Sequence, residues 1–428
     1  MTSDQIDAEA YVWIWLPGTV EPVVAGRIAK EGEQLVFNYG RSYLDRSDAI
    51  SIYEPELPLK PGRLPLLNGL MMPSCLRDAA PDAWGRRVII NRKLGHKDDQ
   101  LDISQLDELT YLLESGSDRI GALDFQRSAT QYVPRGAGTV TLEELLTAAD
   151  RVESGVPITP DLDQALFHGS SLGGARPKAI IESVGKKYIA KFASQSDVFN
   201  IVKGEFVTMR LAAYIGLNVA NVELTRAAGK DVLLIERFDR QRSNQSWQRK
   251  PMVSALTLFG LDEMMARYAS YQDLAEIIRH RFTAPKETLR ELFGRLVFNI
   301  LCGNTDDHAR NHAAFWDGKS LSLTPAYDIC PQARTGGEAS QAMLITGENR
   351  MSTLAVCLKA AAHFLLNEND AVELIEKQLV AIHDHWPTVC EEAKLSEVEQ
   401  NVLWHRQLLN PFAFQGAPST LSKLAGEG

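Results

Sequence analysis

The segment from Gly303 to Asn311 constrains this chain more than any other. Within it, Asp306 and Asn311 stand five positions apart, and Asp328 follows 17 residues after the asparagine. Carboxylate and amide oxygens are the ligands that a hard cation such as Mg²⁺ prefers. A fold that brings these three side chains together can hold a metal-bound phosphate. We therefore expect one lobe of the protein to be built around this segment.

The Asp-x-x-x-x-Asn spacing is typical of the catalytic loop of protein kinases. In such a loop the aspartate accepts or orients the proton of the attacking hydroxyl, and the asparagine holds Mg²⁺. Asp306 and Asp307 could instead be carboxylates that cap a helix. The further carboxylate of Asp328, at the spacing of a second kinase metal ligand, favours the kinase interpretation.

Three weaker signals precede this segment in the order that a kinase requires. The small-residue loop from Ser170 to Lys178 can turn backbone N–H groups toward phosphate, although most Gly-Gly pairs are simple turns. Lys191 follows on a predicted strand, 17 positions after Gly174, where kinases place a lysine that neutralises nucleotide phosphates. Glu205 lies near the start of the next helix and could pair with Lys191. Each residue alone could be an ordinary turn or surface residue.

A zinc site is the competing interpretation of His308 and His312, which are four positions apart. The His-Glu-x-x-His pattern also requires a glutamate, and Ala309 fills that position. We therefore expect His308 to pack or form hydrogen bonds within the catalytic loop.

Composition limits the class of protein. The chain has 428 residues, of which 45% are hydrophobic, and this predicts two or three globular domains. Its net charge of −10 argues against a surface that binds nucleic acid directly. The acidic N-terminus and the short apolar run 11–16 predict neither a signal peptide nor a membrane span. The five scattered cysteines form no Cys-x-x-Cys pair, so we expect reduced thiols in a cytoplasmic protein.

Residue patterns predict short strands at 11–16, 23–28 and 34–39, which form a small sheet. We expect Trp13, Trp15 and Trp84 in the core of this N-terminal subdomain. Capping boxes at Ser104 and Thr141 predict two helices. Further along, we expect strands at 179–183, 188–192 and 231–238, a helix from 199 to 215 ended by Gly216, and a polar loop between lobes at 240–251. From residue 252 the chain reads as mainly helical, with one hairpin at 313–316 and 320–323.

These elements predict an α+β, two-lobed, protein-kinase-like fold with an extra small β-rich N-terminal subdomain and a mainly helical C-terminal lobe. We divide the chain into an N-terminal accessory subdomain at 1–130, a kinase small lobe with the Gly-rich loop at 131–245, and a helical kinase lobe with the catalytic loop at 246–428.

Taken together, the motifs resemble those of the HipA-type serine/threonine kinases, the toxins of bacterial type II toxin–antitoxin modules, over nearly the whole length. The motifs that carry the resemblance are Ala25–Ile28, Phe37–Tyr39, Pro81–Arg86, Gly121–Leu123, Ser171–Lys178, Glu236–Arg240, Asn304–Asn311 and Tyr327-Asp328. The catalytic-loop octapeptide Asn304–Asn311 is the most specific of these.

The resemblance implies a role for each site residue. Asp306 would be the catalytic base, and Asn311 and Asp328 would bind Mg²⁺. The implied ATP contacts are Lys191, His308, the backbone of Glu236 and Phe238, Asp239 at the ribose, and the loop residues Ser171, Leu172, Gly173, Gly174 and Ala175. The family autophosphorylates a serine of this loop, here Ser171 or its neighbour Ser170.

The resemblance also implies partners. The family phosphorylates proteins that include aminoacyl-tRNA synthetases, and pairs with a helix-turn-helix antitoxin of the HipB type. DNA would be reached only through that antitoxin, which agrees with the acidic charge of this chain. Two alternatives stay open from the sequence: a catalytically weak nucleotide-binding co-repressor, and a small-molecule kinase of the aminoglycoside type.

Overall fold

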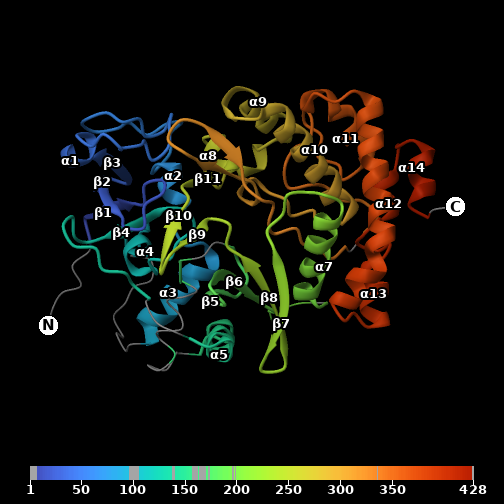
Figure 1. Cartoon of the computed structure of the whole chain (residues 1–428), viewed down its shortest axis with the longest axis horizontal. Coiled ribbons are helices and arrows are strands. Elements are labelled where there is room, and N and C mark those ends of the chain that lie inside the picture. The colour runs from blue at the N-terminus through green and yellow to red at the C-terminus, as the bar shows by residue number, and fades with distance from the viewer. Residues whose placement is uncertain are drawn as a thin grey trace. The chain divides into compact units, whose positions relative to one another are not determined.

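A computed structural model describes residues 7–95, 106–136, 140–156, 162, 170–171, 174–194, 197, 199–334 and 336–426. Figure 1 shows the helices and strands of the chain with their labels. The chain divides into two compact units. The first unit comprises Met1–Gln195, Arg226–Val253 and Phe315–Lys319, and the second comprises Ser196–Thr225, Ser254–Ala314 and Ser320–Gly428. Among the described residues, no helix combines the length and apolar character that crossing a bilayer requires.

The first unit begins with a four-stranded antiparallel sheet in the order β3-β2-β1-β4. Its strands are β1 (Glu9–Ile14), β2 (Val23–Glu31), β3 (Gln34–Tyr39) and β4 (Leu123–Gln126). The three predicted strands are confirmed, and β4 joins them from more than eighty residues further along the chain. Gly26 on β2 makes the sheet possible here, because a Cβ at this position would lie 2.2 Å from the carbonyl oxygen of Asn38.

The chain forms α1 (Arg41–Leu44), α2 (Ser74–Arg77), α3 (Ala83–Gly95) and α4 (Glu108–Glu114) between β3 and β4. Asp107 caps α4 by accepting a hydrogen bond from the Thr110 N–H at 2.9 Å. The capping box predicted at Ser104 is therefore wrong about the capping residue, and Ser104 itself lies outside the described residues. Asp107 is the better cap because its short carboxylate reaches the third amide of the helix.

A second four-stranded sheet has the order β5-β6-β8-β7, with β5 (Lys178–Ser183), β6 (Lys186–Phe192), β7 (Val222–Ala227) and β8 (Lys230–Glu236). Helix α5 (Leu142–Glu153) begins with the predicted capping box between Thr141 and Glu144. Trp84 packs into this core with residues of α5, β5, β6 and β8. The expectation that Trp84 belongs to the core of the N-terminal subdomain is thus wrong, because α3 turns its apolar side toward this sheet.

The polar stretch 240–251 is a hairpin and not the loop that we expected. Strands β9 (Arg240–Ser243) and β10 (Ser246–Arg249) pair antiparallel, with Ser243 opposite Ser246. Asn244 makes the turn in the left-handed conformation, at φ 53°. Asparagine tolerates this conformation better than most residues, so the turn needs no glycine. Neither strand alternates apolar and polar residues, so the sequence pattern does not predict this hairpin.

The second unit is mainly helical, as predicted. Its helices are α7 (Ile201–Tyr214), α8 (Ala255–Leu258), α9 (Tyr271–Arg281), α10 (Pro285–Leu301), α11 (Leu354–Ala360), α12 (Glu368–Glu392), α13 (Glu397–Leu403) and α14 (Ser419–Leu424), with short 3₁₀ turns η2 (Ala266–Tyr268), η3 (Ala309–Asn311), η4 (Ala361–Phe364) and η5 (Pro411–Phe414). Helix α10 is central, since Leu289, Leu292, Phe293, Leu296 and Val297 are fully buried. Helix α7 ends before Gly216, at φ +86°, as predicted.

Strand β11 (Met252–Ser254) and the hairpin β12 (Ala313–Trp316) and β13 (Leu321–Leu323) make a three-stranded sheet in the order β11-β12-β13. The predicted hairpin at this position is confirmed. Helix α7, which the sequence-based division assigns to the small lobe, groups with the second unit. The three-part division at 130 and 245 stays a prediction.

Candidate functional site

The candidate catalytic loop begins directly after α10. Gly303 follows the helix in the left-handed conformation, at φ +72°, and a Cβ there would lie 2.5 Å from the Gln407 carbonyl oxygen. Asn304 then turns back on the helix, donating from its side chain to Asn299 Oδ1 at 2.9 Å and from its backbone to the Asn299 carbonyl at 2.8 Å. The loop therefore starts from a fixed point on a buried helix.

Asp307 anchors the middle of the loop. One of its carboxylate oxygens accepts a hydrogen bond from the Tyr271 hydroxyl and lies 3.0 Å from His312 Nε2. The side chains of Asp307 and His312 are 4% and 3% exposed, and Tyr271 is fully buried. In contrast, the neighbouring Asp306 is exposed. The two consecutive aspartates thus divide their tasks: one holds the loop and the other faces outward.

Asn311 closes the loop. Its Nδ2 donates to the Asp306 carbonyl oxygen at 3.2 Å. This bond orients the side-chain amide, whose oxygen Oδ1 is the atom that can bind a cation. The bond also ties the backbone of the candidate base to the candidate metal ligand, so the two residues keep a fixed separation.

Asp328 is held in an unusual backbone conformation, at φ 58°. Its neighbours fix it: Ala326 exchanges backbone hydrogen bonds with Asn218 and Ala220 at 2.8 and 2.9 Å, and the Tyr327 hydroxyl donates to the Arg310 carbonyl at 2.7 Å. The second contact joins this segment to the catalytic loop. Left-handed non-glycine residues of this kind often mark functional sites, where the surroundings impose the conformation.

The donor set fits Mg²⁺ bound together with a nucleotide. Within the part of the chain that the structure describes, no group of three or more His, Cys, Asp and Glu side chains is arranged to hold a metal ion. If Asn311 and Asp328 hold a cation, phosphate oxygens and water would complete its shell, as they do for Mg²⁺ in phosphoryl-transfer sites. His312, the second histidine of the His308–His312 pair, directs its Nε2 toward the Asp307 carboxylate.

The candidate phosphate loop lies in the first unit, and of its predicted residues Leu172 and Gly173 fall outside the described residues. Gly174 has φ +87°, and a Cβ there would come 2.3 Å from Lys178 Nζ. Lys178 stands directly opposite Lys191 across the β5–β6 pair, and both are 9% exposed. Like charges directly opposite each other on neighbouring strands repel. Sequence reasoning missed Lys178, although its place at the loop's end was the available signal.

Ser170 and Ser171, the candidate phosphorylation sites, are 0% and 3% exposed. The Ser170 hydroxyl oxygen accepts a hydrogen bond from the Gly116 N–H at 2.9 Å, and the Ser171 hydroxyl donates to the Asp118 carbonyl at 3.3 Å. Modification of either hydroxyl would have to break these contacts. Autophosphorylation itself stays a prediction.

The candidate adenine-binding segment follows β8. Glu236 pairs with Lys186 at 2.7 Å, and the Arg237 N–H donates to the Lys187 carbonyl at 2.8 Å. The ring of Phe238 meets that of Phe315 edge to face, with centroids 5.9 Å apart. These contacts fix the course of the backbone through Glu236 and Phe238.

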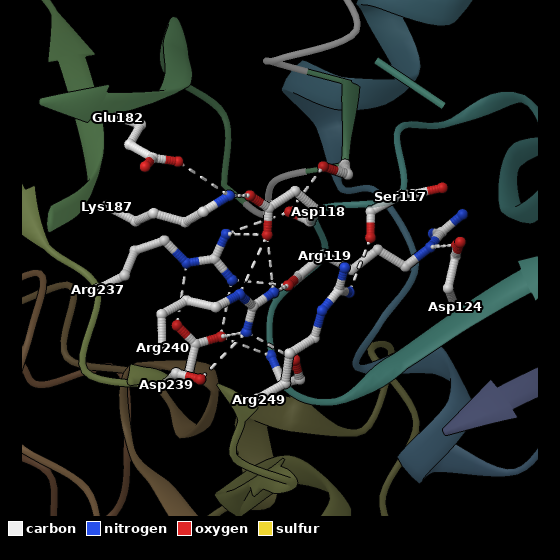
Figure 2. Close-up of polar contacts among 12 residues, drawn as sticks. Ser117, Asp118, Arg119, Asp124, Glu182, Lys187, Arg237, Asp239, Arg240 and Arg249 are labelled. Atoms are coloured by element: carbon white, nitrogen blue, oxygen red, sulfur yellow. Dashed lines mark hydrogen bonds and ion pairs between the residues drawn. The ribbon is translucent and has the colours of Figure 1, made fainter. Parts of the chain in front are cut away.

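Asp239 lies in a buried ion network (Figure 2). It accepts hydrogen bonds from Arg237 at 2.9 and 2.7 Å, from Arg240 at 2.8 Å and from the Gly121 N–H at 2.8 Å. Burial by itself raises the pKa of Asp239, but Arg237 and Arg240 outweigh it and lower that pKa to about 2. A ribose contact by Asp239 would require one of these bonds to be exchanged.

The same network includes Asp118, whose carboxylate pairs with Lys187, Arg237 and Arg240 at 2.5, 3.0 and 2.9 Å (Figure 2). The side chains of Arg237 and Arg240 are 1% exposed, and both also donate to the Arg119 carbonyl. The network therefore fastens the segment after β8 to the segment that precedes β4. No local sequence signal points to it.

Comparison with known proteins gives two matches that together span most of the chain. The sequence model of the HipA-like C-terminal domain matches residues 170–386, and that of the HipA N-terminal domain matches residues 14–126. The chain belongs to the HipA family.

Individual relatives agree with the assignment. The serine/threonine-protein kinase toxin HipA of Shewanella oneidensis is 24% identical over 56% of this chain. Y4mE of Sinorhizobium fredii, whose name describes it as a kinase, is 31% identical over 34% of this chain. The chain spans 60% and 34% of the lengths of these two proteins. A chain in the solved complex of S. oneidensis HipA, HipB and operator DNA is similar over 97% of this chain and 99% of its own, with a TM-score of 0.68 and 18% identity. The predicted two-lobed α+β fold with a small β-rich N-terminal part and a helical C-terminal part is confirmed.

Proposed function

We propose that this protein is an ATP- and Mg²⁺-dependent serine/threonine protein kinase. The observation that carries the proposal is the arrangement of the catalytic loop. Asp306 is exposed, its carbonyl holds the amide of Asn311, and Asp307 is buried against Tyr271 and His312. Such a loop presents one carboxylate and one amide oxygen from a rigid support, which phosphoryl transfer requires.

Each residue then has a defined task. Asp306 orients the acceptor hydroxyl and takes its proton as the oxygen forms its bond to phosphorus, while the bond from phosphorus to the ADP oxygen breaks. Asn311 Oδ1 and the Asp328 carboxylate bind Mg²⁺, and Lys178 and Lys191 offset phosphate charge. Bound Mg²⁺-ATP supplies the transferable γ-phosphoryl group. This catalysis is mainly positioning and charge stabilisation, so the rigidity of the loop contributes directly to the rate.

Self-inactivation forms part of the proposal. Ser171, or Ser170 beside it, is the acceptor, and a phosphate there adds about −1.5 to −2 charges at the place where nucleotide phosphates bind. The added charge repels ATP. It also breaks the contacts of these hydroxyls with Gly116 and Asp118, because a phosphate group does not fit where a buried hydroxyl lies.

The biological role that we propose is that of a growth-inhibiting toxin acting in the cytoplasm. It is supported by the relative named as a serine/threonine-protein kinase toxin and by the related solved complex, which contains HipB and operator DNA. We infer a HipB-type helix-turn-helix antitoxin as partner, DNA contact through that antitoxin alone, and an aminoacyl-tRNA synthetase as the protein substrate. The net charge of −10 agrees with a basic partner that supplies the DNA-binding surface.

The test compares the phosphoproteomes of cells that express the wild type or the Asp306→Asn variant. The proposal predicts new phosphoserine or phosphothreonine on a protein target and on the loop at 170–178 in the wild type alone. Growth arrest with the wild type and none with the variant would support the toxin role. Equal phosphorylation in both strains would refute Asp306 as the base.

A further inference from the structure

The entry of helix α3 contacts the phosphate loop through both backbone groups of one glycine. The Asp82 carboxylate accepts a hydrogen bond from the Gly174 N–H at 2.7 Å, and the Trp84 N–H donates to the Gly174 carbonyl at 3.0 Å. The indole Nε1 of Trp84 also donates to the Lys178 carbonyl at 2.9 Å. Two residues thus hold both ends of the segment from Gly174 to Lys178.

Two further contacts join the phosphate loop to the accessory part of the chain. They are the bonds of Ser170 with Gly116 and of Ser171 with Asp118. All of the accessory residues involved fall within or next to the HipA N-terminal domain match at 14–126. The described residues at the two ends of this candidate loop are therefore held by residues outside the β5-β6-β8-β7 sheet.

The Gly174 contact bears on nucleotide binding because of where the Lys178 ammonium lies. It sits so close to Gly174 that a Cβ on this glycine would be 2.3 Å from Nζ. Gly174 and the Lys178 ammonium are therefore close neighbours, and the Asp82 carboxylate holds the Gly174 amide beside that ammonium.

We propose that Asp82 is a positioning residue for nucleotide binding, which holds the phosphate loop in the conformation that accepts ATP. This inference rests on the proposed kinase function. It assigns to the accessory subdomain a direct part in nucleotide affinity. Asp82 acts through Gly174 and Lys178 and takes no part in the transfer of the phosphoryl group, so its loss affects the Michaelis constant for ATP and leaves kcat almost unchanged.

The experiment compares the full-length wild type with Asp82→Ala, Asp82→Asn and the control Asp48→Ala, which removes an exposed carboxylate paired with Arg46. Mg²⁺-ATP affinity is measured by calorimetry, and amide exchange is followed in the peptides that cover 174–178. We expect Asp82→Ala to weaken ATP binding about tenfold, since a hydrogen bond to a charged group is lost. Asp82→Asn retains an oxygen acceptor and should stay within a few-fold of the wild type.

The two measurements separate the inference from the kinase proposal. If the wild type binds no ATP, the kinase proposal fails, and faster exchange at 174–178 in Asp82→Ala alone still establishes the hold on the loop. Unchanged exchange in Asp82→Ala overturns the inference, and so does tighter ATP binding, which would mean that the carboxylate competes with phosphate. A matching thermal midpoint for Asp82→Asn and the wild type confirms that the comparison is between folded proteins.

Discussion

Tyr271 offers the most direct perturbation of the catalytic loop that leaves every proposed ligand in place. Its hydroxyl donates to the buried carboxylate of Asp307, which also lies 3.0 Å from His312 Nε2. Tyr271→Phe removes one oxygen atom and preserves the ring, which lies 5.4 Å from the His312 ring. The variant therefore tests the hydrogen bond from Tyr271 to Asp307 alone.

The magnitude follows from the burial of the carboxylate. A hydrogen bond to a charged group contributes about 1.5–3 kcal/mol, and the side chain of Asp307, 4% exposed, has little water to replace the lost donor. We expect the free energy of unfolding of the second unit to fall by about 2 kcal/mol. For a unit of about 200 residues, this corresponds to a thermal midpoint lower by roughly 4–8 °C.

The assay is thermal unfolding combined with steady-state kinase kinetics. Because the anchor supports Asp306 and not the phosphate loop, kcat should fall about tenfold or more while the Michaelis constant for ATP changes little. Tyr268→Phe is the matched control, since Tyr268 is 51% exposed, and it should lie within about 0.5 kcal/mol of the wild type. A Tyr271→Phe protein with unaltered midpoint and unaltered kcat would refute the account of the loop.

Three further predictions follow from single sites. Gly303→Ala should destabilise the protein by about 2 kcal/mol or more in thermal unfolding, because φ is +72° and the new Cβ would clash with the Gln407 carbonyl. Gly336→Ala is the control, since a Cβ at this position has no neighbouring atom within 4 Å, and it should have little effect. Lys178→Met should weaken ATP binding about tenfold in calorimetry, while Lys230→Met, which removes an exposed pair with Asp150, should not affect binding. The pKa of Asp239 is lowered to about 2, so the ionised form stabilises the fold above pH 4 and this contribution, about 2 kcal/mol, disappears as the pH falls toward 2. Urea unfolding should accordingly show a stability gap between wild type and Asp239→Asn that narrows over this range, and a constant gap would contradict the ion-pair assignment.

Features with a local cause could be predicted from the sequence. The capping box at Thr141 and Glu144 involves residues three apart, and the strand at 34–39 shows its own pattern of β-prone residues. The candidate site was recognisable for the same reason, since Asp306 and Asn311 lie in one short loop and the bond between them spans only five residues.

Features that depend on distant partners could not be predicted. The Trp84 indole donates to the Lys178 carbonyl, 94 residues away, and nothing in the local sequence distinguishes Trp84 from other core tryptophans. Arg237 binds Asp118 at a separation of 119 residues. Tyr271 escaped notice because nothing in its own helix marks it as the partner of Asp307. Long-range packing decides these contacts, and pattern reasoning has no access to it.

Phosphate transfer by the purified protein tests the central claim most directly. Full-length wild type and Asp306→Asn are incubated with Mg²⁺-ATP, ATP binding is confirmed for each, and phosphopeptides are identified by mass spectrometry. The account predicts phosphoserine within residues 170–178 of the wild type, and none in the variant although it binds ATP. A wild type that binds ATP and transfers no phosphate to itself or to any protein would contradict the account and favour a nucleotide-binding co-repressor.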